Sequence, residues 1–244
     1  MQSPIKQYIR QKKLEPGIIS LLTNPYYFVK KGIYRGLESY AQFLSGRMLD
    51  FGCGNKSYSY LFRVKEHIGL DVFHAGHDHT DEPIDVFYDG KMIPFQAECF
   101  DSVLCAEVFE HLFDCEKSLS EIRRVLKIGG YLLLTTPFFW EEHEQPYDFG
   151  RYTEFGLREL LARHHFEILH YEKYGNFIEV LAQLWNLYLF KKLFRRFAFL
   201  RFVIIPFLIV PTNLMGALFS ILLPKIFDVF HHSVIVAKKV ELSV

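Results

Sequence analysis

The sequence has no excess of charge of either sign, because its 28 basic residues balance its 28 acidic residues. A protein that binds nucleic acid generally carries a basic surplus, so we expect no nucleic-acid partner. Cysteine is scarce, and the four cysteines, Cys53, Cys99, Cys105 and Cys115, show no spacing typical of metal ligands. The first 13 residues lack the apolar core of a signal peptide. We therefore expect reduced thiols and a cytoplasmic protein.

A third glycine is also missing from the glycine-rich turn Asp50–Gly54, where Lys56 and Ser57 follow instead. The turn ends one apolar run, and Asp71 ends a second. In an open α/β sheet such a turn lets the backbone approach a nucleoside, and the second acid accepts the ribose hydroxyls. A dinucleotide needs the third glycine so that its pyrophosphate can reach the helix N-terminus. The pattern predicts S-adenosyl-L-methionine as cofactor and disfavours an NAD-dependent reductase.

Predicted strands alternate with amphipathic helices such as Cys115–Leu126, which indicates βαβ units and a largely parallel sheet covered on both faces. The strands are expected at Arg47–Phe51, Glu66–Val72, Asp85–Tyr88, Ser102–Ala106, Tyr131–Thr136, Phe166–Lys173 and Ser233–Ala237. Gly129-Gly130 is expected to form the turn before the fifth strand. Asn24 and Thr153 are predicted N-caps of helices over Pro25–Leu44 and Glu154–His164.

Four motifs in order carry a family resemblance: Asp50–Gly54, Asp89–Phe95, Phe100–Val103 with Glu110-His111, and Arg124–Leu134. The chain resembles a class I S-adenosylmethionine-dependent methyltransferase of the broad type 11 group. The resemblance implies a Rossmann-like, doubly wound seven-stranded sheet with an antiparallel last strand. It predicts one methyltransferase domain over 1–244, with an N-terminal helical cap over 1–45. A hydrophobic helical insertion over 182–230 is expected between the last two strands.

The resemblance also implies seven cofactor-binding residues: Asp50, Gly52, Gly54, Asp71, Asp89, Gly90 and Glu107. Asp50 is expected near the methionine amino group, and Asp71 is expected to bind the ribose diol. Asp89, with the backbone of Gly90, is expected to contact the adenine amino group. The alternatives are a turn cap for Asp89 and a solvated helix start for Glu107.

The loop His143–Thr153 follows the fifth strand and resembles a loop found in a subset of the family. His143 is the predicted general base, because the unperturbed pKa of histidine lies near neutrality. Asp148 would orient that imidazole and Arg151 would clamp an anionic acceptor, unless the two pair with each other and only stiffen the loop. His111 is expected to be structural. No metal is expected, and a metal role for the surface cluster His74–His79 is disfavoured.

Methyl transfer needs mainly alignment and desolvation, so the sequence identifies the donor better than the acceptor. The 22 residues Phe202–Leu223 carry no charge. A run of this length can cross a bilayer, but Pro206 and Pro211 are expected to divide it into pieces too short to span. We therefore expect 185–225 to contact the cytoplasmic membrane face peripherally.

Five cations are expected to meet anionic lipid headgroups in that segment: Lys191, Lys192, Arg195, Arg196 and Arg201. The expected acceptor is a small molecule, a lipid or a lipid-linked molecule. One alternative is a soluble sugar or metabolite methyltransferase whose apolar insertion forms a homodimer interface or an acceptor pocket. The other is a non-catalytic nucleoside-binding scaffold.

Overall fold

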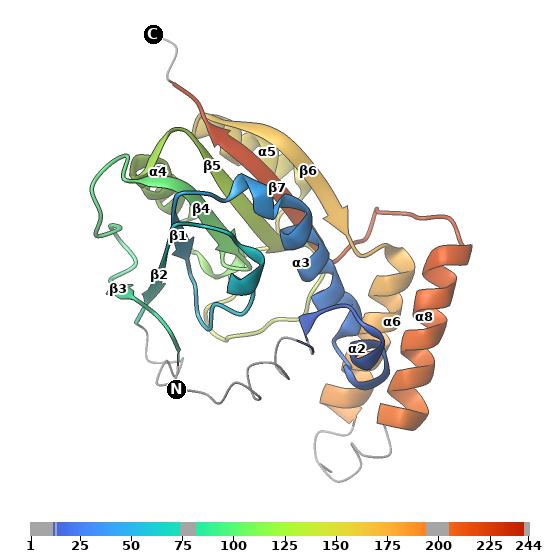
Figure 1. Cartoon of the computed structure of the whole chain (residues 1–244). Coiled ribbons are helices and arrows are strands. Elements are labelled where there is room, and N and C mark those ends of the chain that lie inside the picture. Colours follow the sequence, from blue (N-terminus) through green and yellow to red (C-terminus); the bar gives the residue numbers. More distant parts are fainter. Residues whose placement is uncertain (1–11, 13, 74–81, 194–204, 242–244) are drawn as a thin grey trace. The chain divides into compact units, whose positions relative to one another are not determined.

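The computed structural model describes residue 12 and residues 14–73, 82–193 and 205–241 (Figure 1). The cluster His74–His79 and the cations Arg195, Arg196 and Arg201 lie outside these residues. The chain packs into two compact units, one made of Met1–Arg35 with Lys173–His232 and the other of Gly36–Glu172 with Ser233–Val244. The first unit joins parts of the predicted cap and insertion, while the single domain over 1–244 stays a prediction.

One sheet contains all seven strands in the order β3-β2-β1-β4-β5-β7-β6. The strands are β1 (Arg47–Phe51), β2 (Glu66–Val72), β3 (Val86–Tyr88), β4 (Phe100–Ala106), β5 (Leu126–Pro137), β6 (Phe166–Tyr174) and β7 (His232–Lys239). Strand β1 pairs in parallel with β2 and β4, and β2–β3 and β4–β5 are also parallel. Strands β6 and β7 run in opposite directions (Figure 1). The predicted fold class is therefore confirmed, including the antiparallel last strand.

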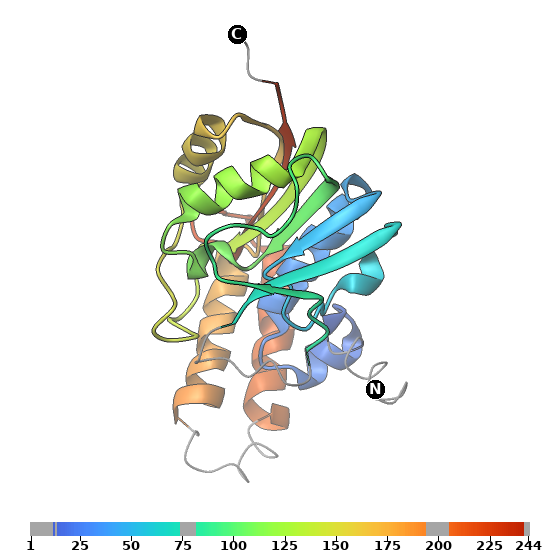
Figure 2. The ribbon, with the colours of Figure 1, turned by 90° about the vertical axis from the view of Figure 1, so that its left-hand side faces the viewer.

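The central strands are apolar on both faces because helices cover both sides of a parallel sheet. In β1 and β4, Met48, Leu49 and Val103 have no exposed surface. The helices α4 (Cys115–Val125) and α5 (Glu154–Arg163) lie on one side of the sheet (Figure 2). Their apolar stripes, such as Leu119 and Leu157, join the core of the second unit.

Of the two predicted N-caps, Thr153 is confirmed, whereas Asn24 lies three residues before the first residue of the next helix. The Thr153 hydroxyl accepts a hydrogen bond from the Gly156 amide at 3.2 Å, as expected of the N-cap of α5. Asn24 ends α2 (Ile18–Thr23), and its side chain accepts a hydrogen bond from the Tyr26 amide at 2.9 Å. The helix predicted over Pro25–Leu44 is observed as α3 (Tyr27–Tyr40) and the 3₁₀ turn η1 (Ala41–Phe43).

Gly129-Gly130 does not form the turn that the sequence predicts. Both glycines lie inside β5, where the pairing register with β4 shifts between Phe100 and Ser102. Gly129 has φ +78°, and a Cβ on Gly130 would lie 2.8 Å from the carbonyl oxygen of Asp101. The glycines therefore allow a β-bulge, and β5 continues on both sides of it.

Within the first unit, two helical segments follow β6. The segment α6 (Phe177–Leu187) continues into the π-helix η4 (Tyr188–Leu193), and the π-helix η6 (Ile205–Ile209) continues into α8 (Val210–Leu222). Both views show α6 and α8 side by side (Figures 1 and 2). The predicted helical insertion is confirmed.

The expectation that two prolines divide this apolar run is wrong. Ile205–Leu222 forms one helical run of 18 residues. Pro206 lies in the π-helix η6 and Pro211 lies at the start of α8, where the hydrogen-bond pattern of the run changes, and the helical run continues past both. In the part of the chain that is described, this is the one helix long and apolar enough to cross a membrane, by length and composition only.

Candidate functional site

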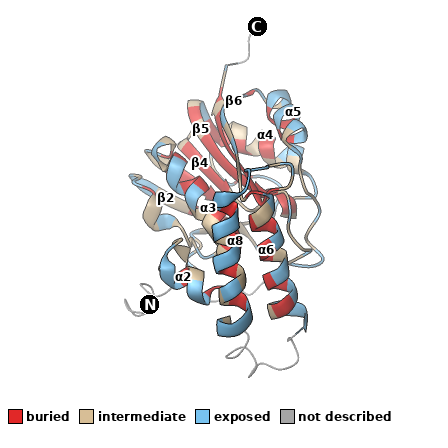
Figure 3. Ribbon diagram, turned by 90° about the vertical axis from the view of Figure 1, so that its right-hand side faces the viewer, coloured by how far each residue is buried: buried red, intermediate tan, exposed pale blue. Residues whose placement is uncertain are grey.

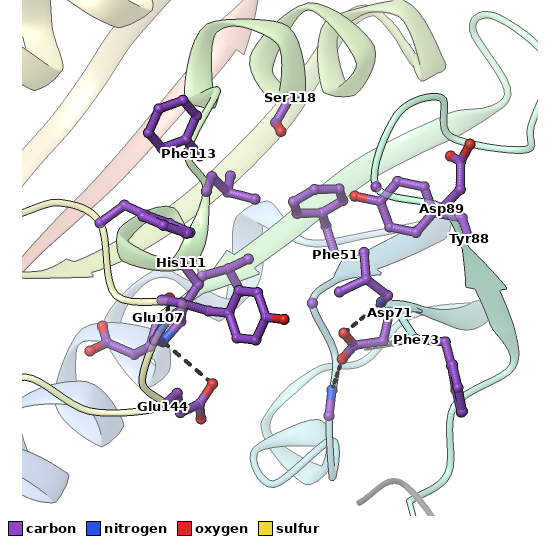
Figure 4. A pocket seen from close by; sticks show the side chains of 18 of the residues that line it. Phe51, Asp71, Phe73, Tyr88, Asp89, Glu107, His111, Phe113, Ser118 and Glu144 are labelled. Carbon is purple, nitrogen blue, oxygen red and sulfur yellow. Dashed lines mark hydrogen bonds and ion pairs between the residues drawn. The ribbon is translucent and has the colours of Figure 1, made fainter. Parts of the chain in front are cut away.

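A cavity of about 640 Å³ opens where strands β1, β2 and β4 end, within the second unit (Figure 4). The direction of the strand order reverses between β1 and β4, and the edge at such a switch point is where open α/β sheets bind ligands. Six of the seven predicted cofactor-binding residues line the cavity: Gly52, Gly54, Asp71, Asp89, Gly90 and Glu107. Its other lining residues include Phe51, Tyr88, Val108, His111, Leu112, Phe113, Glu144, Tyr147 and Phe149.

The glycine turn after β1 has the backbone that the sequence predicts. Gly52 has φ +71° and Gly54 has φ +40°, in the left-handed region that glycine tolerates. A Cβ on Gly52 would lie 2.4 Å from Cγ2 of Val108, so no other residue fits there. The Gly54 amide donates a hydrogen bond of 2.8 Å to Oδ2 of Asp71. The turn is therefore attached to the acid that ends the second strand.

Asp71 is held from two sides at the wall of the cavity (Figure 4). Its Oδ2 accepts from Gly54, and its Oδ1 accepts a hydrogen bond of 2.8 Å from the Val72 amide. Each carboxylate oxygen has two lone-pair sites, so both oxygens can accept a further donor. The carboxylate can thus take two adjacent hydroxyl groups from a ligand.

The Asp50 side chain contacts His67. Its buried carboxylate accepts a hydrogen bond of 2.8 Å from Nε2 of His67 on β2. Burial raises the pKa of Asp50, and the hydrogen bond from His67 opposes that rise. Among the described residues that line the cavity Asp50 is not found. Its predicted place beside the methionine amino group stays a prediction.

Asp89 and Gly90 form a turn beyond β3 and line the cavity. The Oδ1 of Asp89 accepts a hydrogen bond of 2.9 Å from the Lys91 amide, which lowers the pKa of Asp89. Gly90 has φ +75°. Asp89 therefore caps its turn, as the alternative proposed, and also reaches the ligand cavity.

Glu107 follows β4 directly and lines the cavity without starting a helix. Its φ of +56° is unusual for a residue other than glycine. The Thr135 hydroxyl donates a hydrogen bond of 2.8 Å to Oε1 of Glu107, and the Glu107 amide donates one of 3.0 Å to the Thr135 carbonyl. Strand β5 therefore holds both the backbone and the side chain of Glu107 in place.

The loop after β5 brings His143, Asp148 and Arg151 together. The Arg151 guanidinium donates to both Asp148 oxygens, at 2.5 and 2.8 Å, and lowers the pKa of Asp148 to about 2. The His143 amide donates to Asp148 at 3.0 Å, and His143 Nδ1 lies 3.2 Å from the same oxygen. Asp148 thus both contacts the imidazole and stiffens the loop through Arg151.

These three loop residues are not among the described residues that line the cavity. Arg151 also donates to the carbonyl oxygens of Gly150 and Glu141, so its donors are largely committed within the loop. The roles predicted for His143, Asp148 and Arg151 stay predictions.

His111, which the sequence suggested was structural, lines the cavity (Figure 4). Its Nδ1 lies 2.7 Å from the carbonyl oxygen of Tyr147, a contact that requires a proton on Nδ1 and leaves Nε2 as the acceptor of the neutral ring. The His111 and His143 ring centroids are 4.8 Å apart. Its position just after the fourth strand was the signal that could have identified it.

Residues 49–134 match the family model described as a methyltransferase domain. A curated relative, phthiotriol/phenolphthiotriol dimycocerosates methyltransferase 1 of Mycobacterium ulcerans (strain Agy99), is 33% identical over 113 residues. That alignment covers 42% of this chain and 42% of the relative, so less than half of the relative's length is matched.

Several solved structures share the fold at low sequence identity. A SAM-dependent methyltransferase from Archaeoglobus fulgidus has a TM-score of 0.54 and 18% identity, covering 85% of this chain and 93% of the other. Phosphoethanolamine N-methyltransferase 2 of Haemonchus contortus, in complex with S-adenosyl-L-methionine, has a TM-score of 0.52 and 16% identity, covering 98% and 61%. The YcgJ protein of Bacillus subtilis has a TM-score of 0.51 and 14% identity, covering 86% and 99%.

Proposed function

We propose, from the premise that residues 49–134 form a class I methyltransferase domain, that this chain transfers a methyl group from S-adenosylmethionine to a lipid or lipid-linked acceptor at a membrane face. The family match and the shared fold confirm the premise, which was first drawn from the sequence. The enzyme class and the cofactor predicted from the sequence agree with it. The acceptor and the membrane contact are supported by separate observations.

The donor site rests on one observation, the anchored carboxylate of Asp71 at the switch point of the sheet. Asp71 would accept the two ribose hydroxyls, while the backbone at Gly52 and Gly54 leaves room for the nucleoside. Asp89 and Glu107 would contact the adenine and the methionine part. The cavity carries no cluster of cations that would attract a pyrophosphate, because Lys117 is the one cation among the described residues that line it.

Competition binding tests the donor. Labelled S-adenosylhomocysteine should bind the full-length protein, and unlabelled S-adenosylmethionine should displace it while NADH does not. Displacement by NADH at a similar concentration would contradict the assignment.

For the chemical step, His143 would take the proton of the acceptor as its nucleophile attacks the methyl carbon and the carbon–sulfur bond breaks. Asp148 would hold the imidazole, and Arg151 would hold Asp148. The ring of His143 packs on that of His111, which reaches the cavity. This arrangement supports a role for the loop at the acceptor side of the cavity.

The membrane contact is supported by which residues the helices of the first unit bury and expose, and Figure 3 shows exposed surface along α6 and α8. The buried residues of α8 are Asn213, Gly216 and Ser220, while Leu218 and Ile221 are 51% and 75% exposed. Helix α6 buries Gln183 and Asn186 together with apolar residues such as Val180, while Trp185 is 54% exposed. A helix in water buries its apolar face, so this pattern indicates an apolar surrounding.

The buried amides of this unit bond to one another and to the backbone. The Asn186 amide donates to Oδ1 of Asn213 at 2.7 Å, and the Asn213 amide donates to the Leu21 carbonyl at 2.8 Å. Gln183 donates to the Pro25 carbonyl at 2.8 Å. Internal amide pairs hold helices together in a bilayer, where apolar contact gives no driving force between them.

Helices α6 and α8 contact each other at a glycine, Gly216. A Cβ on Gly216 would lie 2.7 Å from Cβ of Ala182, so α6 and α8 approach closely only because glycine stands there. Close approach at small residues is typical of helix pairs in lipid. The two helices also expose large apolar side chains, including Leu181, Leu218 and Ile221, and soluble monomers rarely expose large apolar patches.

We infer that a bilayer covers this surface, which we call the apolar face: Leu181, Trp185, Leu214, Met215, Leu218, Ile221 and Leu222. The exposed Lys191 and Lys192 at the end of η4 fit anionic headgroups. The curated relative is named as a methyltransferase of phthiotriol and phenolphthiotriol dimycocerosates. Because β6 and β7 belong to one sheet, the segment between them must begin and end on the same side of the membrane.

Vesicle flotation tests the membrane contact. The protein should float with vesicles that contain anionic lipid, and less protein should float at high salt. Recovery in the soluble fraction as a compact dimer would instead support the homodimer interface.

A further inference from the structure

Glu110 carries a carboxyl group with no hydrogen-bond partner in a fully buried position. Among the described residues, neither of its carboxyl oxygens has a hydrogen-bond partner, and the residue is 0% exposed. A buried carboxylate is costly unless it is paired or binds a metal ion. Protonation does not remove the cost, because the resulting O–H would still lack an acceptor. The position therefore indicates a missing ligand.

Two imidazoles stand next to this carboxyl group. One ligand atom each from Glu110, His111 and His143 can be chosen so that all three lie within 4.8 Å of one another. Nε2 of His111 lies 3.8 Å from Oε1 of Glu110, beyond hydrogen-bond distance. Ligands of a tetrahedral zinc ion lie about 3.4 Å apart, so small side-chain rotations would close the group around a cation.

The remaining nitrogen of each imidazole is already held. His111 Nδ1 donates to the Tyr147 carbonyl at 2.7 Å. His143 Nδ1 lies 3.2 Å from the Glu141 carbonyl and 3.2 Å from Oδ2 of Asp148. An oxygen acceptor on the second nitrogen is the usual support of a metal-binding histidine, because it fixes the tautomer whose other nitrogen binds the metal.

The surrounding charge favours a cation as the missing ligand. Glu107 and Asp148 act on Glu110 as like charges, and Oε2 of Glu144 lies 3.8 Å from His111 Nε2. Arg151 is the nearby cation, but both of its terminal nitrogens donate to Asp148. The group therefore has an excess of negative charge that one divalent ion would neutralise.

We propose that Glu110, His111 and His143 bind one divalent transition-metal ion at the edge of the cavity. Two imidazoles and one carboxylate suit zinc or manganese. Three protein ligands leave positions open for a water molecule or for the acceptor. Because His111 lines the cavity, an open position can face the bound acceptor.

This role rests on the proposed methyl transfer, and it replaces the role of His143 as general base, because a nitrogen that binds a metal ion cannot also take a proton. An acceptor hydroxyl bound to the metal loses its proton to solvent more readily, since a divalent ion lowers the pKa of a bound O–H group. The oxygen then forms a bond to the methyl carbon, and the carbon–sulfur bond breaks with its electron pair staying on sulfur. The products are a methyl ether, the demethylated donor and one released proton.

Metal binding is measured on the full-length protein without any acceptor. After treatment with a chelator, the protein is titrated with Zn²⁺ by calorimetry and with Mn²⁺ by electron paramagnetic resonance. We expect one site per chain. Glu110→Gln and His143→Asn should each weaken binding at least about tenfold. His170→Asn, an imidazole outside the group, is the matched control and should bind as the wild type does.

Equal binding by the wild type, Glu110→Gln and His143→Asn, or no binding by the wild type, would overturn the proposal. His143→Asn alters a half-buried loop residue, so it remains informative if Glu110→Gln fails to fold. Affinity for S-adenosylhomocysteine is measured in parallel. A wild type that binds the donor but no metal contradicts only the metal site, whereas a wild type that binds no donor contradicts the proposed function.

Discussion

Replacement of Asp71 by alanine perturbs the donor site at its best-defined contact. The substitution removes a carboxylate that accepts from Gly54 and Val72, both at 2.8 Å, and that is free to accept two further donors. A hydrogen bond to a charged group contributes about 1.5–3 kcal/mol, but water replaces part of it after truncation. We expect the variant to lose about 1–3 kcal/mol of donor affinity, which is roughly a 5- to 150-fold rise in Kd.

Titration calorimetry with S-adenosylmethionine and S-adenosylhomocysteine measures this loss. Asp85→Asn is the matched control, because Asp85 accepts from the Gly69 amide at 2.6 Å near the same strands but is not among the described residues that line the cavity. Its donor affinity should stay within about twofold of the wild type, since it removes no ligand contact.

A ligand without the ribose hydroxyls separates recognition of the diol from damage to the Gly54 turn. The wild type should bind the dideoxy analogue more weakly than S-adenosylhomocysteine. The Asp71→Ala variant should bind the two ligands with equal affinity. If removal of the hydroxyls costs the same affinity in both proteins, Asp71 does not bind the diol and the reasoning is refuted.

Three further predictions concern the loop and the apolar face. His143→Ala should lower turnover while donor affinity stays near that of the wild type, as stopped-assay kinetics and calorimetry would measure; unchanged turnover removes His143 from the chemical step. Asp148→Asn should lower the free energy of unfolding by about 2 kcal/mol at pH 7, because the pKa of Asp148 is lowered from 3.8 to about 2. That contribution is present above about pH 4 and disappears as the pH falls through 2, so urea unfolding curves that differ equally at pH 7 and pH 2 would contradict it. Leu218→Glu should reduce vesicle flotation more than Leu218→Ala does, and equal flotation of the two would argue against lipid contact at α8.

Much of the second unit could be predicted from the sequence because its signals are local. The bounds of β1 and β2 are those predicted, since apolar runs there end at an acid or a glycine turn. The positions of Asp71, Asp89 and Glu107 at one edge follow from the rule that parallel strands end on the same side. The early start of β5 could not be predicted, because the bulge at Gly129 depends on its pairing with β4.

The group around Glu110 could not be predicted because it depends on long-range packing. The Phe149 amide donates to the Glu110 carbonyl at 2.7 Å, and this contact brings the loop after β5 onto the turn after β4. This contact and the hydrogen bond of His111 to the Tyr147 carbonyl make neighbours of His111 and His143, which are far apart in the sequence. Similarly, apolar composition marks α8, but only the fold shows that its buried residues are polar or small.

The prolines illustrate a limit of composition-based reasoning. A proline inside a helix removes a hydrogen bond, so Pro206 and Pro211 were expected to end the helical run. Pro206 lies in the π-helix η6 and Pro211 lies at the start of α8, and the helical run continues past both. A change from π-helical to α-helical hydrogen bonding accommodates a missing amide, and no pattern in the sequence marks where that change occurs.

Methyl transfer into a lipid phase tests the central claim most directly. Purified protein is incubated with S-adenosylmethionine labelled in the methyl group and with vesicles made from a bacterial lipid extract, and then the organic and aqueous phases are counted. The account predicts label in the organic phase with the wild type and much less with Asp71→Ala. Label found only in the aqueous phase, or in neither phase with a protein that binds the donor, would contradict it.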